Sequence, residues 1–262
     1  MYIDSHIHLY DEQYAHDLPE VISESLQAGV RLMIVPSVDI ESARAINKMC
    51  QSYPCLVPAY GIHPHEAGKA SASDWEELED IVSKASALGE IGLDYHYNFS
   101  PRECQIEVLQ KQLALAEKLN KPVIIHCREA EEDMLHILKA TGLPEAGGVI
   151  HSCTAYWDTV KKYLDLGLHI GYTGMVTFPK LEYIRETAAQ CPLRSLLIET
   201  DGPYLAPVPF RGRRCVPAHV IKTAECIAQL RGMKAEAIGE SSAAAAIELF
   251  NLNLDNVSER GL

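Results

Sequence analysis

Short apolar runs alternate with longer amphipathic stretches from one end of the chain to the other. Strands separated by helical segments are typical of a parallel sheet with crossover helices, and eight such units can close a barrel. We therefore expect an α/β fold, a single TIM (β/α)8 barrel domain over residues 1–262. A further helical segment at 234–251 predicts an extra C-terminal helix on the outside or bottom of the barrel. The eight expected strands are 2–7, 31–35, 56–60, 87–92, 123–127, 148–151, 168–171 and 195–199.

Residues typical of helix starts and ends support helices between these strands. Ser100-Pro101-Arg102-Glu103 and Ser73-Asp74-Trp75-Glu76 each place a glutamate three residues after a serine, which predicts a capping box at the start of a helix. Asn120 is expected to end the first of these helices, and Gly29 to end a helix that begins near Asp17.

Side chains of the kind that bind metals stand at the C-terminal ends of five of the expected strands. Because the carboxyl ends of barrel strands point to one common centre, these side chains are expected to meet there. His6 and His8 are two residues apart, so both point to the same side of a strand, and Asp4 shares that side and could support them. The candidate ligands are His6, His8, Glu90, His126, His151 and Asp201.

Each candidate taken singly has a structural interpretation as well. A lone His-x-His arises by chance, a histidine that ends a strand is more often a core residue, and Asp201 could cap a helix. Glu90 could be a salt-bridged core acid, but no nearby strand offers an obvious Lys or Arg, and an unpaired buried carboxylate is costly. An open doubly wound sheet would draw ligands from only two or three strands. The complete set favours a metal centre in a closed ring, with Glu90 between two metals.

Other polar residues at the same end of the barrel are candidates for substrate binding. His63, in Gly61-Ile62-His63-Pro64, is either a seventh ligand or a donor to the substrate, and the planar guanidinium of Arg128 suits a phosphate. Arg211, Arg213 and Arg214 follow the eighth strand and form either a solvated loop or, as we favour, a local anion funnel. Four imidazoles with two carboxylates suit Zn or Mn, whereas Mg prefers oxygen ligands.

Composition narrows the function further. The 262 residues are 47% hydrophobic and 23% charged, and 23 Lys and Arg against 36 Asp and Glu give a net charge of −13. Since coating nucleic acid requires many neutralised phosphates, this charge argues against such a protein, although an enzyme could still grip one or two phosphates. The eight cysteines form no CxxC pair, no signal peptide is evident, and no apolar run is membrane-length. We therefore expect a cytoplasmic protein with reduced thiols and no membrane contact.

The motifs in their order resemble the TatD-type metal-dependent deoxyribonucleases, a branch of the amidohydrolase-like metal hydrolases. They are Asp-Ser-His-Ile-His at 4–8, Gly-Ile-His-Pro at 61–64, GEIGLDY at 89–95, His-Cys-Arg-Glu at 126–129, the histidine at 151 and Glu-Thr-Asp-Gly-Pro-Tyr-Leu at 199–205. The resemblance implies a TIM barrel that cleaves DNA phosphodiesters, often from a 3′ end. It implies that all six candidates bind metal, that Glu90 bridges, and that Asp201 also acts as the base.

Some positions depart from that family's usual pattern, none of them a ligand, and they bear on substrate preference more than on catalysis. They are Cys153, Ala155, Cys215, Val216 and Ala245. The favoured function is a divalent-metal-dependent phosphodiesterase, a 3′–5′ exonuclease type of DNase that uses a metal-bridged hydroxide. We expect two divalent ions per subunit (Zn, Mn or Mg), DNA ends as substrate, a monomer, and Asp201, Glu90 and His63 as catalytic residues. The alternatives are a hydrolase of a non-nucleic ester or amide, or of the acyl bond of aminoacyl-tRNA, and a non-catalytic barrel scaffold.

Overall fold

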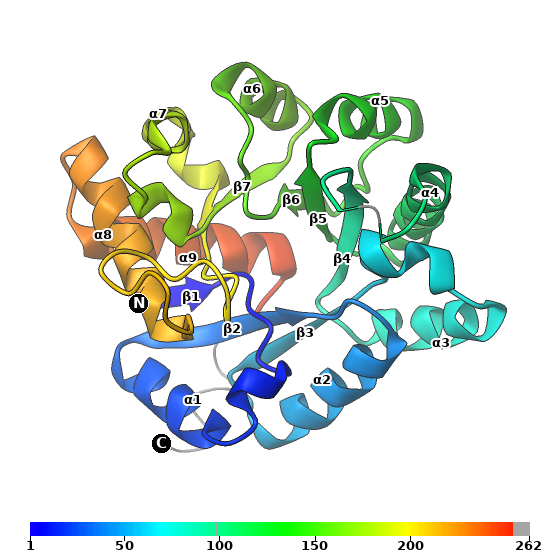
Figure 1. Ribbon diagram of the computed structural model, residues 1–262, viewed down its shortest axis with the longest axis horizontal. Helices are drawn as coiled ribbons and strands as arrows, with labels where there is room; N and C mark the ends of the chain where they lie inside the picture. The colour runs from blue at the N-terminus through cyan, green and yellow to red at the C-terminus, as the bar shows by residue number, and fades with distance from the viewer. Residues whose placement is uncertain (98, 254–262) are drawn as a thin grey trace.

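The computed structural model describes residues 1–97 and 99–253. Within these residues, eight parallel strands follow one another around a ring (Figure 1). They are β1 (Tyr2–Asp4), β2 (Val30–Pro36), β3 (Leu56–Tyr60), β4 (Ala87–Asp94), β5 (Val123–Arg128), β6 (Gly148–Ile150), β7 (His169–Tyr172) and β8 (Leu196–Ile198). Each overlaps one of the expected runs, and the predicted TIM barrel is confirmed. The expected domain, 1–262, includes residues 254–262, which lie outside the described ones.

Helices surround the strands as an outer layer, one after each strand along the chain (Figure 1). Their apolar sides face the ring, and the sheet is therefore buried on both faces. Among the described helices, none combines the length and the apolar character that a membrane span requires. The outer helices are α1 (Leu18–Gln27), α2 (Ile40–Ser52), α3 (Ala72–Ser83), α4 (Arg102–Leu119), α5 (Glu131–Thr141), α6 (Trp157–Asp165), α7 (Glu182–Gln190) and α8 (Val220–Arg231).

Helix α9 (Ala235–Phe250) is the predicted extra C-terminal helix. It covers the end of the barrel at which the strands begin, which we call the lower end; the upper end is the one at which the strands finish. It packs on β1 and β8 and lies behind the strands in Figure 1. Its small and apolar side chains join a cluster of inward-facing strand residues, most of which are among the first three positions of their strands. This lower cluster contains Ile3, Leu32, Ile34, Val57, Ala59, Ala87, Ile124, Val149 and Leu197 from the strands, with Ala243, Ala245, Ala246, Leu249 and Phe250 from α9.

The two expected helix starts exist, but their capping residues differ from the prediction. Helix α3 is capped by Ser71 rather than Ser73: the Ser71 hydroxyl accepts from the N–H of Asp74, and the Asp74 carboxylate accepts from the N–H of Ser71 at 2.8 Å. Helix α4 has Pro101 as its N-cap, without a side-chain hydrogen bond. The predicted cap, Ser100, has tertiary partners instead, since its hydroxyl donates to a carbonyl oxygen and accepts from a backbone N–H in the segment 65–68.

The two expected helix ends are confirmed. Asn120 follows α4 with φ at +48°, and Gly29 follows α1 with φ at +96°. Both values lie in the left-handed region, where a helix ends readily.

The ring closes between β8 and β1 through the segments that follow these two strands. The N–H of Ser5 donates to the carbonyl of Ile198 at 3.2 Å, and the N–H of Asp201 donates to the carbonyl of His6 at 2.9 Å. A parallel bridge between Ile7 and Gly202 completes the seam. Both strands are therefore shorter than expected, and the closing segments are the ones that carry three candidate ligands.

Strand β1 ends early because a side chain competes with the sheet for the backbone. Asp4 accepts from the N–H of His6 at 3.3 Å, which turns the chain two residues on. The same carboxylate accepts from the backbone N–H of Thr200 at 2.9 Å and from its hydroxyl. Asp4 thus fastens the two sides of the seam together. It supports the backbone that carries His6, rather than an imidazole as the sequence suggested.

Candidate metal centre

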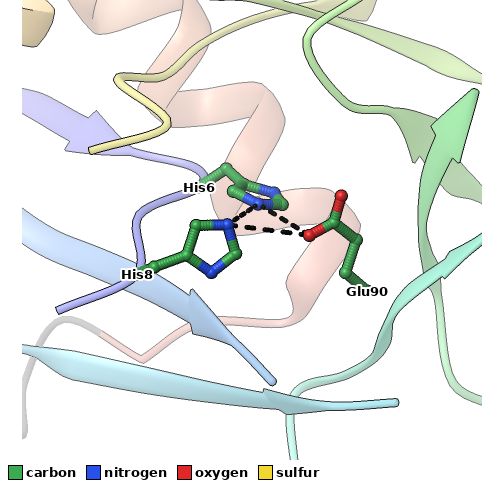
Figure 2. A group of neighbouring side chains, drawn as sticks. All are labelled: His6, His8 and Glu90. Atoms are coloured by element: carbon green, nitrogen blue, oxygen red, sulfur yellow. Dashed lines mark hydrogen bonds and ion pairs between the residues drawn. The ribbon is translucent and has the colours of Figure 1, made fainter. Parts of the chain in front are cut away.

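The six candidate ligands converge at the carboxyl end of the barrel. Figure 2 shows the tightest group, in which His6 and His8 approach Glu90 from the segment after β1. The Nε2 atoms of His6 and His8 are 3.2 Å apart, and they lie 3.3 Å and 3.7 Å from Oε2 of Glu90. Three donor atoms from two distant segments thus share a space the size of one ion.

Asp201 and His151 complete this group from the other side of the seam. Oδ1 of Asp201 lies 3.4 Å from Nε2 of His8, 3.8 Å from that of His6 and 3.6 Å from that of His151. The rings of His6 and His151 stack with centroids 3.4 Å apart at an angle of 17°. The alternative that Asp201 caps a helix is excluded, since the next helical turn in the described chain begins at Pro217.

A second group forms around the other oxygen of Glu90. Oε1 of Glu90 lies 3.0 Å from Nδ1 of His126, 3.7 Å from Nε2 of His63 and 3.8 Å from Nε2 of His151. The two oxygens of one buried carboxylate therefore face two different sets of imidazoles. Glu90 therefore belongs to two of the groups that could hold a cation.

Outer polar partners orient several of these imidazoles. Nδ1 of His151 lies 2.9 Å from Glu199, and Nε2 of His126 lies 2.9 Å from Asp94. Nδ1 of His8 lies 3.3 Å from the hydroxyl of Tyr10. A histidine that binds a metal through one nitrogen almost always has such a partner at the other, because the partner fixes the ring and its tautomer.

The donor set fits divalent cations. The donor atoms within each of three groups lie within 4.8 Å of one another: His6, His8 and Glu90; His6, His151 and Glu199; and His63, Glu90 and His126. The buried Nδ1 of His6 has no hydrogen-bond partner in the described structure, which is unusual for a polar atom away from water. Mixed imidazole and carboxylate donors suit borderline ions such as Zn²⁺ or Mn²⁺.

Charge interactions within the site shift the pKa of its members. Burial alone would raise the pKa of Glu90, but the imidazoles of His6 and His63 outweigh it and hold that pKa well below its usual value. Burial alone would lower the pKa of His126 and of His151. The carboxylates of Asp94 and Glu90 raise the first to about 8, and that of Glu199 raises the second to about 10. In the metal-free protein these two rings therefore carry protons, which a cation bound by them would have to displace.

His63 lies beside this centre in a defined tautomer. Its Nδ1 accepts a hydrogen bond from the backbone N–H of His65 at 3.1 Å, so its proton is on Nε2. Burial lowers the pKa of His63 well below its usual value, which keeps the ring neutral. A neutral ring with its N–H at the metal-facing end can donate a hydrogen bond to an oxygen there.

The ligands open into a cavity of about 750 Å³ at the end of the barrel. Arg128 lines this cavity beside His126, and its guanidinium lies 4.8 Å from the centre of the Tyr97 ring. The cavity is large enough for a small polar ligand and has a cation at its wall.

The three arginines of the expected anion funnel lie elsewhere. Arg211, Arg213 and Arg214 line a neighbouring cavity of about 480 Å³, which shares Tyr204 and Leu205 with the first. Arg214 is held by an ion pair, with its guanidinium 2.8 Å from the carboxylate of Asp17. Arg211 lies 4.2 Å above the ring of Phe178. Contact of this cluster with a substrate remains a prediction.

Sequence reasoning missed two members of the site, Asp94 and His65. Asp94 is nearly inaccessible, and its Oδ2 lies 3.0 Å from Nε2 of His65 as well as close to His126. The available signal was spacing: Asp94 is four residues after Glu90 on one strand and so shares its face, and His65 is two residues after His63. Glu199, the first residue of the motif at 199–205, contacts His151 directly.

Four of the five positions that depart from the family pattern are buried, and they lie in different parts of the barrel. Cys153 and Ala155 are buried in the segment that leads from His151 to α6. Cys215 is buried, and its carbonyl accepts a hydrogen bond from the hydroxyl of Tyr14. Ala245 belongs to the lower cluster under α9, away from the metal centre.

Comparison with known proteins places this centre in a family. The family described as TatD related DNase matches residues 3–251. The chain is 36% identical to the uncharacterized metal-dependent hydrolase YabD of Bacillus subtilis, over 97% of this chain and 100% of that protein. It is 34% identical to the 3′-5′ ssDNA/RNA exonuclease TatD of Edwardsiella piscicida, over 95% and 99%.

A solved structure shows the same fold. The crystal structure of YJJV, a TatD homologue from Escherichia coli, superposes with a TM-score of 0.90 at 30% identity and covers 96% of this chain and 98% of that one. Family match, curated relatives and structural likeness agree over nearly the whole length. The chain therefore belongs to the TatD-related DNase family and is a metal-dependent hydrolase.

Proposed function

We propose that this protein is a divalent-metal-dependent phosphodiesterase that removes nucleotides from the 3′ end of single-stranded DNA. The observation that carries the proposal is the position of Glu90, whose two oxygens face two sets of imidazoles below a cavity lined by Arg128. The name of the Edwardsiella piscicida relative, an exonuclease on single-stranded DNA and RNA, supports the substrate. Divalent cations held here would supply a nucleophile at neutral pH and neutralise charge on a phosphoryl group.

Asp201 has the properties of a proton acceptor in this reaction. Burial alone would raise its pKa, but the imidazoles of His151, His6 and His8 lower it, so the carboxylate is ionised. Its side chain keeps 17% of its surface accessible, whereas that of Glu90 keeps 3%. The more accessible carboxylate is the one that an attacking water molecule can reach, and Glu90 is left to hold the cations.

His63 and Arg128 have the properties of substrate-binding groups. The Nε2–H of His63 can donate to a phosphoryl oxygen above Glu90, and the neutral ring can do so over a wide pH range. The guanidinium of Arg128 at the cavity wall can hold a second oxygen of the same group. Together they would hold a phosphodiester in the cavity that Asp201 also lines.

The net charge of −13 limits how such an enzyme holds DNA. Long-range attraction between the protein and a polyanion is absent, so binding must come from local contacts near one phosphate. An enzyme that acts at chain ends needs contacts with only a few nucleotides. This is why the charge is compatible with an exonuclease and unfavourable for a protein that wraps duplex DNA.

The test is hydrolysis of 5′-labelled single-stranded oligonucleotides with added Mn²⁺, Mg²⁺ or Zn²⁺. We expect a ladder that shortens from the 3′ end, and no ladder when the 3′ linkages are phosphorothioates. Glu90→Gln and Asp201→Asn, checked for folding by circular dichroism, serve as inactive controls. The proposal fails if the wild-type protein releases no more nucleotide than these variants. Faster turnover of esters, amides or aminoacyl-tRNA would identify a different hydrolase, and absence of bound metal with intact folding would favour a scaffold.

A further inference from the structure

Two aromatic side chains are exposed beside the mouth of the metal-centre cavity. Tyr97 and Phe99 follow β4, and 42% of the first and 67% of the second is accessible to solvent. Their rings are nearly parallel, at 13°, with centroids 5.4 Å apart. Exposed aromatic rings forfeit the free energy that burial would give, so a parallel pair at the rim of an active-site cavity calls for a ligand.

This aromatic pair is held in place from the side of the metal centre. The ring of His65 meets Phe99 edge-on at 4.8 Å and Tyr97 edge-on at 5.6 Å. His65 is in turn bound to Asp94, which also holds His126 and accepts from the backbone N–H of Tyr97 at 2.9 Å. The pair is therefore linked to a ligand of the centre by a short chain of polar contacts.

The surroundings of the pair match a nucleotide in charge and shape. Tyr97 lines the same cavity as Glu90 and Asp201, and the guanidinium of Arg128 lies over its ring at 4.8 Å. An aromatic surface beside a cation suits a nucleotide, because the base can stack on the aromatic ring and the phosphate can pair with the arginine. Phe99 stacks on the Tyr97 ring and is the more exposed of the two, so it carries the apolar surface away from the cavity toward solvent.

We propose that Tyr97 and Phe99 form a stacking surface for a nucleobase of a single strand whose adjoining phosphodiester lies in the cavity. This inference rests on the proposed function and names how that site selects its substrate. Stacking on an aromatic side chain strengthens binding by about 1–3 kcal/mol per base and accepts any base. A base paired within a duplex cannot reach the surface, so the pair would favour unpaired 3′ ends without reading sequence.

Binding to an inactive background tests the surface without cleavage. In the Asp201→Asn protein, with Mn²⁺ present, we would titrate a short single-stranded oligonucleotide with 2-aminopurine at one of its last three positions. At one of these positions, stacking should quench the fluorescence of the base. Adding Phe99→Ala should weaken binding about tenfold, which corresponds to about 1.4 kcal/mol of binding free energy. It should also remove the quenching. Phe99→Trp should restore both. Leu230→Ala, which removes another exposed apolar side chain, in α8, is the matched control and should change neither.

An abasic nucleotide at the same position separates stacking from a structural effect. The Asp201→Asn protein should bind the abasic strand about tenfold more weakly than the normal strand. With Phe99→Ala the two strands should bind alike. Equal binding of both strands before the substitution, or equal weakening of both by it, would overturn the stacking surface. If wild-type protein degrades DNA while Phe99→Ala has no effect, the stacking surface is wrong and the function stands; if the wild type neither binds nor cleaves a single strand, the proposed function fails and the stacking surface with it.

Discussion

The two ends of the barrel are built from the same strands and hold opposite chemistry. Near the strand starts, the inward side chains are aliphatic, and α9 covers them with small residues such as Ala243 and Ala246. Beyond the strand ends, the interior holds the imidazoles and carboxylates of the candidate metal centre. One end is a buried apolar cluster, while the other opens into the cavity.

The upper end is also where the backbone departs from relaxed geometry. Four non-glycine residues with positive φ follow β5, β6 and β8: Glu129, Ser152, Asp201 and Leu205, at +45° to +57°. Such conformations are unfavourable for these residues and persist only when the surroundings fix them. The lower end thus stabilises the fold, and the upper end uses part of that stability to hold charges and strained turns in place.

The largest effect is expected from the upper end. Asp201→Asn should fold normally but lower kcat for 3′ nucleotide release by about 100- to 10,000-fold, the usual contribution of a positioned proton acceptor. The amide keeps the shape and the backbone N–H bond to His6, so the metal-free variant should still unfold cooperatively, at a somewhat lower Tm because the charge that pairs with His151 is lost. Steady-state kinetics together with calorimetry would show it. Turnover close to wild type would remove Asp201 from the mechanism.

A substitution at the lower end is expected to change stability and leave activity unchanged. Leu197 is fully buried in the lower cluster, and Leu197→Ala should lower the free energy of unfolding by about 2–5 kcal/mol. For a chain of this size the Tm should fall by on the order of 5–15 °C. Metal content and kcat per folded molecule should stay at wild-type values below the transition. Loss of metal at low temperature would show that the two ends are not separable.

Most of the fold could be predicted because it follows from repeated local signals. Each expected apolar run overlaps one of the strands, and α9 was expected from its helical pattern. The errors lie where tertiary contacts compete with local ones. Ser100 hydrogen-bonds to the segment 65–68 instead of capping α4, and Asp4 turns the chain before β1 reaches Ile7.

The candidate metal centre was predictable as a set of residue types at strand ends, and the structure brings all six residues together; their binding of metal stays a prediction. The spacing of residues in the sequence could not predict which polar side chain contacts the other nitrogen of each imidazole. Asp94 was visible only as part of a motif, and its contacts with His126 and His65 depend on how β4 and β5 are registered. The position of Arg214 depends likewise on Asp17, far away in the chain. Long-range pairing of polar side chains has no periodic signal in a sequence.

A smaller effect is expected from the outer partners of the ligands. Glu199→Gln should weaken metal binding by about 10- to 100-fold, because the carboxylate that orients His151 becomes a neutral amide. Competition with a fluorescent chelator would measure the change. Glu182→Gln, the same substitution on the exposed surface of α7, is the control and should bind metal as wild type does. Unchanged affinity in Glu199→Gln would show that the contact with His151 does not orient a ligand.

The smallest effect for a single group, about tenfold per pH unit for each proton, comes from protonation of two candidate ligands. The pKa of His126 is raised to about 8 and that of His151 to about 10, so both rings are protonated at pH 7 in the metal-free protein. A cation must displace these protons, and affinity should therefore fall as pH falls, by about tenfold per pH unit for each proton released. Titration calorimetry at pH 7 in buffers of different ionisation enthalpy should detect the release of at least about one proton per chain.

The same protons have the opposite consequence for folding without metal. A histidine whose folded pKa is raised stabilises the fold below its unfolded value, near 6.5, and this contribution is lost as pH rises through the folded value. The metal-free protein should therefore lose stability between pH 6.5 and about 8, as His126 loses its proton. The affinity of the protein for metal should rise over the same pH range. Leu197→Ala should shift both stability curves downward without changing their slopes, since the lower cluster contains no titratable group. If metal binding released no protons, the ligand rings would be neutral in the free protein and this coupling would be wrong.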